Sequence, residues 1–279
     1  MTTQSLEYFS MLVQEDAHIP LFEAALSIGQ DVQPELDLGR LQEDVDALAG
    51  KLRRRLPEDA SPIQKLRMLN HYFYNELGFR GNINDYYLPD NSYLHRVLET
   101  RRGIPISLAV LYMELAQQIG LSVRGISFPG HFLMKMSVSH GEIVLDPMNG
   151  VSLSREDLEE RVEPYILQQE FPDDFQLAAY LQSAQSRDIL VRMLRNLKTV
   201  YMQQEGWQNL LKVQERLMIL LPKDIAERRD RGIAYAHLEC PQAALQDLEA
   251  YIAQRPYAMD VAALRARLPG LREASGRLN

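Results

Sequence analysis

Three short stretches between residues 101 and 150 decide the expected fold: RGIPISLA at 102–109, FPGHF at 128–132 and VLDP at 144–147. The first opens an apolar pattern of helical spacing that ends at Gly120, a residue type that commonly terminates helices. The other two lie in short, partly alternating segments separated by turn residues, a pattern typical of strands. We therefore expect three strands of a small antiparallel sheet at Ser122–Phe128, His131–Val138 and Glu142–Leu145, with a tight hairpin at His140-Gly141.

Helices are expected before and after this segment. Leu36–Leu56 carries apolar residues at helical spacing with charges between them. Ser61 before Pro62 predicts a helix start, because serine caps the first amide groups and proline suits the first turn; Gly78 should end this helix. Further expected elements are a loop at Gly81–Asn91, a short helix at Tyr93–Thr100, and a helix start at Ser154 with Asp157 as its capping partner.

An internal repeat marks the C-terminal third of the chain. Tyr201 and Tyr235 are 34 residues apart, as are Pro222 and Pro256, and 34 residues is the period of tetratricopeptide repeats. The second copy has the expected residue types at five positions of that pattern: Gly232, Tyr235, Ala244, Leu248 and Pro256. The first copy departs from the pattern at two positions that are normally small: Lys198 and Leu210. Two repeats cannot bury their faces alone, so a capping helix is expected after them.

The order of residues in the three opening stretches also suggests chemistry. A helix start, a histidine on a strand and an aspartate on the next strand is the order found in papain-like and transglutaminase-like enzymes. The amide groups and dipole at a helix N-terminus activate a nucleophile. A histidine such as His131 then accepts its proton, and an aspartate such as Asp146 fixes the imidazole tautomer.

At these residues the chain resembles the transglutaminase-like superfamily. It more closely resembles the SirB-type family, bacterial proteins in which such a domain precedes tetratricopeptide-like repeats. The resemblance covers residues 35–270 and implies an α+β fold, with a mostly helical transglutaminase-like domain and its small antiparallel sheet followed by an all-α repeat domain. We place these domains at 1–172 and 173–279, with the break at 171–174, repeats at about 187–222 and 223–256, and then the capping helix.

The nucleophile of that superfamily does not carry over. Its usual pattern is Gly-x-Cys with an alanine four residues after the cysteine, and alignment on Gly103 and Ala109 places Pro105 at the cysteine position. Proline has no nucleophilic atom. Ser107 is the alternative nucleophile, but two residues along a helix rotate a side chain by about 200°. Its other expected role is that of a helix-start serine bonded to nearby backbone.

We expect His131 and Asp146 to be in contact, whether or not they serve catalysis. A buried charge-assisted pair can hold two strands together without any reaction. No metal or cofactor is expected, because the histidines lack paired ligand spacing and Cys240 is the only cysteine.

The repeat domain suggests a different use of the chain. In tetratricopeptide proteins, ligands commonly contact the first helix of each repeat. The corresponding positions here are Arg192, Arg195, Thr199, Arg229, Ile233 and His237. Because guanidinium groups bind carboxylates bidentately, the three arginines would favour a peptide carboxylate or an acidic segment. Alternatively, the preceding domain covers this face, or the arginines pair with Asp188, Glu227 and Asp230.

Composition narrows the remaining classes of function. The 279 residues include 30 Lys and Arg against 38 Asp and Glu, a formal net charge of −8 that argues against binding nucleic acid over a broad face. The N-terminus shows no secretory signal pattern, and no apolar run reaches the roughly 18 residues of a membrane span. We expect a soluble cytoplasmic protein.

Two functions remain open at this point. The first is an interaction module, in which a degenerate, non-catalytic transglutaminase-like domain is fused to repeats that bind a protein or peptide, with a regulatory role as one form of it. The second is a hydrolase or acyltransferase that uses Ser107, His131 and Asp146. Pro105 argues against the enzyme, so we favour the interaction module.

Overall fold

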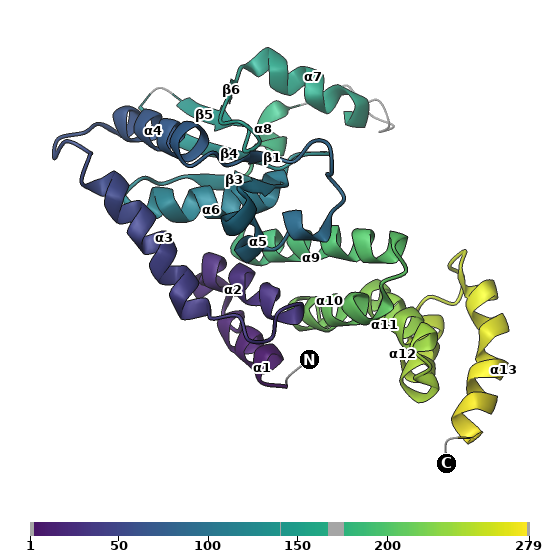
Figure 1. The fold of residues 1–279 in the computed structure, drawn as a ribbon. Coiled ribbons are helices and arrows are strands. Elements are labelled where there is room, and N and C mark those ends of the chain that lie inside the picture. Colours follow the sequence, from purple (N-terminus) through teal and green to yellow (C-terminus); the bar gives the residue numbers. More distant parts are fainter. Residues whose placement is uncertain (1–2, 140, 167–175, 278–279) are drawn as a thin grey trace. The chain divides into compact units, whose positions relative to one another are not determined.

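The computed structural model describes residues 3–139, 141–166 and 176–277 (Figure 1). The chain divides into two compact units. The sheet unit comprises Glu15–Gly29 and Glu35–Met193, and the repeat unit comprises Met1–Gln14, Gln30–Pro34 and Leu194–Asn279. The expected break at 171–174 lies outside the described residues, so the division after residue 172 stays a prediction.

Helices fill most of residues 16–100, as expected. They are η1 (Asp16–His18), α2 (Leu21–Ser27), η2 (Ile28–Asp31), α3 (Leu38–Arg53), α4 (Pro62–Asn70), η3 (His71–Glu76), η4 (Pro89–Asn91) and α5 (Leu94–Thr100). The predicted start of α4 is confirmed by a capping box, in which the Ser61 hydroxyl accepts from the Gln64 N–H and the Gln64 side chain accepts from the Ser61 N–H. A π-helical turn, η3, continues this segment towards Gly78, whose φ of +72° suits glycine.

A buried helix and a small antiparallel sheet form the centre of the sheet unit. α6 (Pro105–Gln118) packs against the first two strands of a sheet whose order is β3 (Arg124–Ile126), β4 (Leu133–Val138), β5 (Gly141–Leu145), β6 (Ser152–Leu153) (Figure 1). The three predicted strands are confirmed: β3 and β4 are shorter than expected, β5 begins one residue earlier, and β6 is an additional strand. His140, part of the predicted hairpin turn, lies outside the described residues.

Smaller elements complete this unit. β1 (Arg80–Gly81) and β2 (Arg102–Gly103) form a short parallel pair just before α6. α7 (Arg155–Ile166) begins at the predicted cap, since the Asp157 N–H donates to the Ser154 hydroxyl at 3.1 Å, and α8 (Leu177–Tyr180) follows. Side chains from the sheet and these two helices form one apolar core: Ile126, Phe128, Leu133, Val144, Leu158, Val162 and Leu177.

The repeat unit consists mainly of helices. α9 (Ser186–Gln203), of which residues from Leu194 belong to this unit, is followed by α10 (Trp207–Leu220), α11 (Ile225–His237), α12 (Pro241–Gln254) and α13 (Val261–Arg277). From α10 to α13, each helix packs against the next one in the chain. Gly232 confirms the logic of the repeat pattern, because a Cβ there would lie 3.0 Å from both Asp247 and Leu248. The small residue lets α11 and α12 approach each other closely.

The N-terminal segment also belongs to the repeat unit. α1 (Thr3–Leu12) packs against α10, where Arg216 is fully buried. The Arg216 guanidinium donates to both carboxylate oxygens of Asp31, at 2.7 and 2.8 Å, and to the Ser5 hydroxyl at 3.2 Å. It also lies 4.7 Å from the ring centroid of Phe9. A buried, bidentate pair of this kind fixes the position of the segments that carry it.

Candidate functional site

The predicted contact between His131 and Asp146 is confirmed. The antiparallel register pairs Met134 with Leu145, so the residues just before β4 and just after β5 lie at the same end of the sheet. There, His131 Nε2 lies 3.0 Å from Asp146 Oδ1. The histidine side chain is 24% exposed and the aspartate 8%, so the imidazole reaches solvent while its partner is enclosed.

Besides His131, the Asp146 carboxylate accepts hydrogen bonds from two further groups. Its Oδ2 accepts from Arg161 Nη1 on α7 at 2.9 Å, and its Oδ1 accepts from the Met148 N–H at 3.0 Å. Burial alone would raise the pKa of the Asp146 carboxyl, but the hydrogen bonds from His131, Met148 and Arg161 outweigh it and lower that pKa to about 2. The carboxylate is therefore charged at neutral pH.

The turn after Asp146 is held in one conformation. The Gly150 N–H donates to the Asp146 carbonyl at 2.8 Å, and Gly150 has a φ of +74°. A Cβ there would lie 2.3 Å from the Tyr74 ring, so only glycine fits. The Tyr74 hydroxyl in turn donates to the Pro147 carbonyl at 3.1 Å. These contacts keep the carboxylate oriented towards His131.

Arg192 anchors the turn that carries His131. Its guanidinium donates to the Phe128 carbonyl at 3.2 Å and to the His131 carbonyl at 2.8 Å, and lies 5.7 Å from the Phe132 ring centroid. Burial lowers the pKa of this guanidinium, and the nearby Tyr86 and Tyr165 raise it by a smaller amount. The repeat pattern predicts Arg192 on a ligand-binding face of the repeats, but in the structure its guanidinium is engaged within the sheet unit, next to the histidine.

The start of α6 presents no nucleophile among the residues expected there. Pro105, at the cysteine position of the superfamily, is buried in the first helical turn. Ser107 is fully buried, and its hydroxyl lies 2.6 Å from the Asn91 carbonyl and 3.0 Å from the Ile104 carbonyl while accepting from the Ile104 N–H at 3.1 Å. The single hydroxyl proton is thus shared between two carbonyl oxygens, and one lone pair of the oxygen accepts from an N–H.

Ser107 therefore has the geometry of a helix-start serine bonded to backbone. Among the hydrogen bonds of the described residues, none joins it to His131. A serine nucleophile needs a base within hydrogen-bond reach of its hydroxyl and an open space in front of it. What the arrangement provides instead is an oriented imidazole and a charged carboxylate that tie together β4, β5 and α7.

The two arginines predicted to bind a partner on the repeat unit, Arg195 and Arg229, form ion pairs with acidic side chains of the same unit. Arg195 donates to Glu227 at 2.8 Å and to Asp224 at 3.1 Å. Arg229 donates to Asp230 at 2.6 Å and to Asp260 at 2.8 Å. These contacts agree with the alternative that the sequence leaves open, in which the arginines pair with acidic residues of the chain such as Glu227 and Asp230.

The other predicted contact residues of this unit are Thr199, Ile233 and His237, and each has intramolecular neighbours: Ile233 packs against the apolar core of the unit. The Thr199 hydroxyl donates to the Arg195 carbonyl of its own helix at 3.0 Å. The His237 ring stacks on Trp207 with centroids 3.7 Å apart, and burial lowers the pKa of the imidazole. Both side chains remain exposed on the surface of their helices to a degree that a partner could contact.

Lys198, which replaces the small residue of the repeat pattern, lies within a buried charge network. Its ammonium binds Glu227 at 2.7 Å and also binds Asp230. The Glu227 and Asp230 side chains are only 3% and 5% exposed. Each of the two carboxylates thus receives a cation from α9 or α11, and the network joins these helices.

Sequence reasoning missed three residues of these clusters: Arg161, Arg216 and, as a turn anchor, Arg192. Arg161 lies on α7 in a run of charged residues that gives no sign of which one turns inward. The sequence does give a cue for the charge network around Lys198, because a long cation at a position that is normally small requires an anionic partner.

Two kinds of site find no support in the part of the chain that the structure describes. No group of three or more His, Cys, Asp or Glu side chains there is placed to hold a metal ion. Nor is any helix among those residues both long and apolar enough to cross a membrane. The thiol of Cys240 is exposed and lies in the repeat unit, on the loop before α12.

Comparison with known proteins agrees with both units. The profile described as "Transglutaminase-like superfamily" matches residues 40–195, and the profile "Tetratricopeptide repeat" matches residues 197–269. A "UPF0162 protein" of Xylella fastidiosa is 40% identical over 258 residues, which cover 92% of each chain. "Protein SirB1" of Salmonella typhimurium is 27% identical over 240 residues, covering 85% of this chain and 87% of the relative. The chain belongs to the transglutaminase-like superfamily, as a member of the SirB-type family in which such a domain precedes tetratricopeptide repeats.

Proposed function

We propose that this chain is a non-catalytic transglutaminase-like protein that acts as a protein-interaction module through its repeat unit. The observation that carries the proposal is the hydroxyl of Ser107, which is buried and bonded to three backbone groups beside a proline at the nucleophile position. His131 and Asp146 then keep a structural role. Tetratricopeptide repeats supply the binding surface, because their stacked helices present an extended face to partners.

The charge network argues for a partner other than the acidic peptide first expected. An acidic segment would need to displace Glu227 or Asp230 from Arg195 and Arg229, and these two carboxylates are almost completely buried. Displacement would leave buried negative charges without their cations, which is strongly unfavourable. The proposed partner is therefore a protein or peptide that contacts the exposed parts of the first helices without requiring free arginines.

The first experiment tests the absence of catalysis. The full chain is incubated with a fluorophosphonate probe, which labels activated serines, and compared with the Ser107→Ala variant. We expect no labelling of either. Labelling of the wild type that disappears in Ser107→Ala would restore the hydrolase or acyltransferase alternative.

The second experiment tests the interaction face with two matched threonines. Thr199 and Thr100 are both exposed and both donate to the carbonyl four residues earlier, at 3.0 and 2.8 Å, but only Thr199 lies in the repeat unit. We expect Thr199→Trp to reduce recovery of cross-linked partners from lysate and Thr100→Trp to leave it unchanged. Equal recovery with both variants counts against binding at this face.

A further inference from the structure

The outer edge of β3 is only partly paired. β3 is the first strand of the four-stranded sheet, so one side of it faces away from β4. Residues of the same chain cover part of that side, where Ile126 forms an antiparallel bridge with Ser183 and the Ala184 N–H donates to the Gly125 carbonyl at 2.8 Å. The chain then leaves the edge to begin α9 at Ser186. The outer edge of β3 is therefore already paired with an extended segment of the same chain at Gly125 and Ile126.

The alternation of an antiparallel strand identifies the groups left open. The Gly125 carbonyl points away from β4, towards Ala184, so Gly125 and its partner Met134 form a non-hydrogen-bonded pair. The backbone N–H and C=O groups of the neighbouring residues, Arg124 and Ile126, point towards β4. Hence the N–H of Gly125 and the carbonyl of Val123 both face outward. The described residues supply neither group with a hydrogen-bond partner. A donor and an acceptor on the same side of an edge strand are what an added strand requires.

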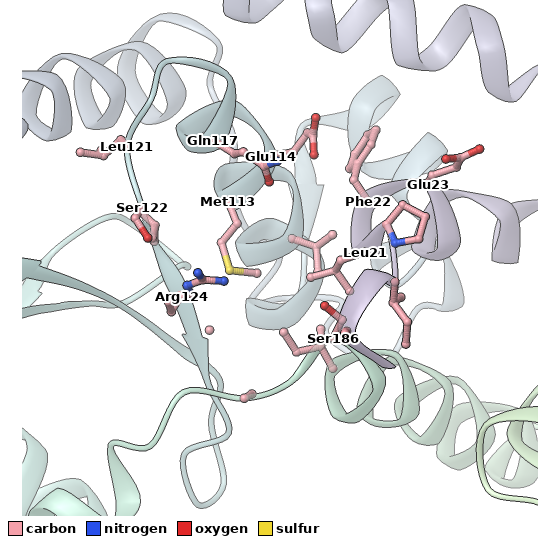
Figure 2. Close-up of a pocket in the computed structure, with 18 of the residues that line it drawn as sticks. Leu21, Phe22, Glu23, Met113, Glu114, Gln117, Leu121, Ser122, Arg124 and Ser186 are labelled. Carbon is pink, nitrogen blue, oxygen red and sulfur yellow. The ribbon is translucent and has the colours of Figure 1, made fainter. Parts of the chain in front are cut away.

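A cavity of about 780 Å³ lies beside these open groups, entirely within the sheet unit. Figure 2 shows its walls: Leu21 and Phe22 come from α2, Met113 from α6, Ser122 and Arg124 from the β3 segment, and Ser186 from the start of α9. Met113 and Leu21 give it an apolar surface that is partly accessible. A side chain that projects from a strand added to β3 would have room here.

Three charged residues line the cavity: Glu23 on α2, Glu114 on α6 and, at the β3 end, Arg124 (Figure 2). The charge at the β3 end indicates one property of an occupant that binds there. Arg124 is exposed, lines the cavity and has no ion-pair partner among the residues that the structure describes. In Figure 2 its guanidinium extends towards Met113 rather than away from the cavity. An anionic side chain near Arg124 would gain a charge-assisted hydrogen bond, and a side chain two residues away on the same face would reach the apolar wall.

We propose that the open edge of β3 and the adjoining cavity bind an extended peptide segment of a partner protein, which adds a strand beside Val123–Gly125. The segment carries an acidic side chain near Arg124 and an apolar side chain two residues away that enters the cavity beside Met113. This site lies in the sheet unit and does not depend on the function proposed for the repeat unit, so either can fail without the other.

The probe is a random dodecapeptide library displayed on phage, selected on the full-length chain. Enriched peptides are synthesised and their affinity is measured by fluorescence anisotropy against wild type, Met113→Arg and Met202→Arg. Met202 is a partly exposed methionine of the repeat unit and serves as the matched control. We expect Met113→Arg to weaken binding by about tenfold or more, which corresponds to a loss of about 1.4 kcal/mol of binding free energy. We expect Met202→Arg to leave the affinity unchanged. A library that yields no peptide preferring wild type to Met113→Arg overturns the proposal.

An N-methyl scan of the selected peptide tests whether it binds as a strand. Each backbone amide is methylated in turn, which removes one donor at a time. Because alternate residues of a strand face its neighbour, methylation at every second position should weaken binding by about fivefold, and the positions between should tolerate it better. Weakening without a two-residue period would show that the peptide does not add to the sheet.

Amide exchange at Gly125 locates the bound strand. In the free chain the Gly125 N–H should exchange quickly, while the Arg124 N–H, bonded to β4, exchanges slowly. Peptide binding should slow exchange of the Gly125 N–H by at least about tenfold and change that of the Arg124 N–H little, since Gly125 gains a hydrogen bond to the added strand and Arg124 already donates to β4. Protection of Gly125 in the free chain that grows with protein concentration would identify a second copy of the chain as the occupant and overturn the proposal.

Discussion

Each unit of the molecule has one residue that does not fit the pattern its sequence resembles, and the two residues have opposite consequences. In the sheet unit, the sequence comparison made above aligns Pro105 with the superfamily's cysteine, and the helix start around it is buried and regular. In the repeat unit, Lys198 stands where the repeat pattern has a small residue, and two nearly buried carboxylates, Glu227 and Asp230, bind its ammonium.

The difference lies in what each substitution does to the electrostatics of its surroundings. A proline in place of a thiol brings no charge into the helix start and needs no ionic partner, and His131 and Asp146 are still in contact at 3.0 Å. Adding a cation to a packed helix interface requires anions, because an unpaired buried charge is strongly destabilising. A family motif can therefore lose its reactive atom without disturbing the fold, whereas a charge inserted into a packing position must be matched.

The largest effect is expected from Lys198→Met. Without the ammonium, Glu227 and Asp230 lose a shared cation, although Arg195 and Arg229 remain, and we expect the free energy of unfolding to fall by about 3 kcal/mol. Urea denaturation at neutral pH measures it. Lys198→Gly, which restores the residue type of the family, should also destabilise the chain.

The exposed lysine of the same unit, Lys223, provides the control for this change. Lys223→Met should alter the free energy of unfolding by no more than about 0.5 kcal/mol. A loss as large as that of Lys198→Met would mean that methionine, rather than the missing charge, is responsible.

Asp146→Asn should have a smaller and pH-dependent effect. The folded-state pKa of about 2 lies below the ordinary 3.8, so the charged carboxylate contributes about 2 kcal/mol above pH 4. This contribution is lost as the pH falls from about 4 towards 2. We therefore expect the variant to be less stable than wild type at pH 7, by denaturant titration, and the gap to shrink as the pH approaches 2.

A more exposed carboxylate provides the comparison for Asp146. Asp90 pairs with Arg96 at 3.0 Å, with its side chain 52% exposed. Asp90→Asn should lower the free energy of unfolding by less than about 1 kcal/mol, as surface ion pairs do. If the Asp146→Asn gap stayed constant down to pH 2, the stabilisation would not come from the charge of Asp146.

The smallest effect is expected from Pro105→Cys, which places a thiol at the position aligned above with the superfamily's cysteine. Loss of proline at the first turn should cost about 1 kcal/mol or less, mainly through a more flexible unfolded chain. Because this position is buried, we expect maleimide to alkylate the introduced thiol more slowly than the exposed Cys240, as measured by mass spectrometry of the digested chain. Fast alkylation that His131→Ala abolishes would show that the scaffold can still activate a thiol.

Features encoded within a few residues could be predicted from the sequence. The cap at Ser61, the start of α6 at Pro105 and the 34-residue spacing of the repeats depend on local hydrogen bonds and periodicity. The contact between His131 and Asp146 was also predictable, because two strands joined by a short turn bring the residues beyond their paired ends together.

Features that depend on the choice among many similar charges could not be predicted. Arg161 and Arg192 each lie on a helix with other charged residues, and only the tertiary arrangement selects them as the partners of Asp146 and of the His131 turn. The same holds for Arg195 and Arg229: the sequence suggests that they bind a peptide, but it does not show that nearby carboxylates already pair with both. Sequence patterns show which faces a helix buries, but they do not show which of several equivalent ions becomes enclosed.

The pairing of Asp31 with Arg216 has a consequence for how the chain is made. The two residues are 185 positions apart in the sequence. At ribosomal rates, Asp31 and the first helix must wait roughly ten to forty seconds before α10 has been synthesised. During that interval Phe9, which is completely buried in the finished repeat unit, has no α10 to cover it. Formation of this unit thus waits for the synthesis of α10, and the residues of α1 reach their final partners long after they emerge.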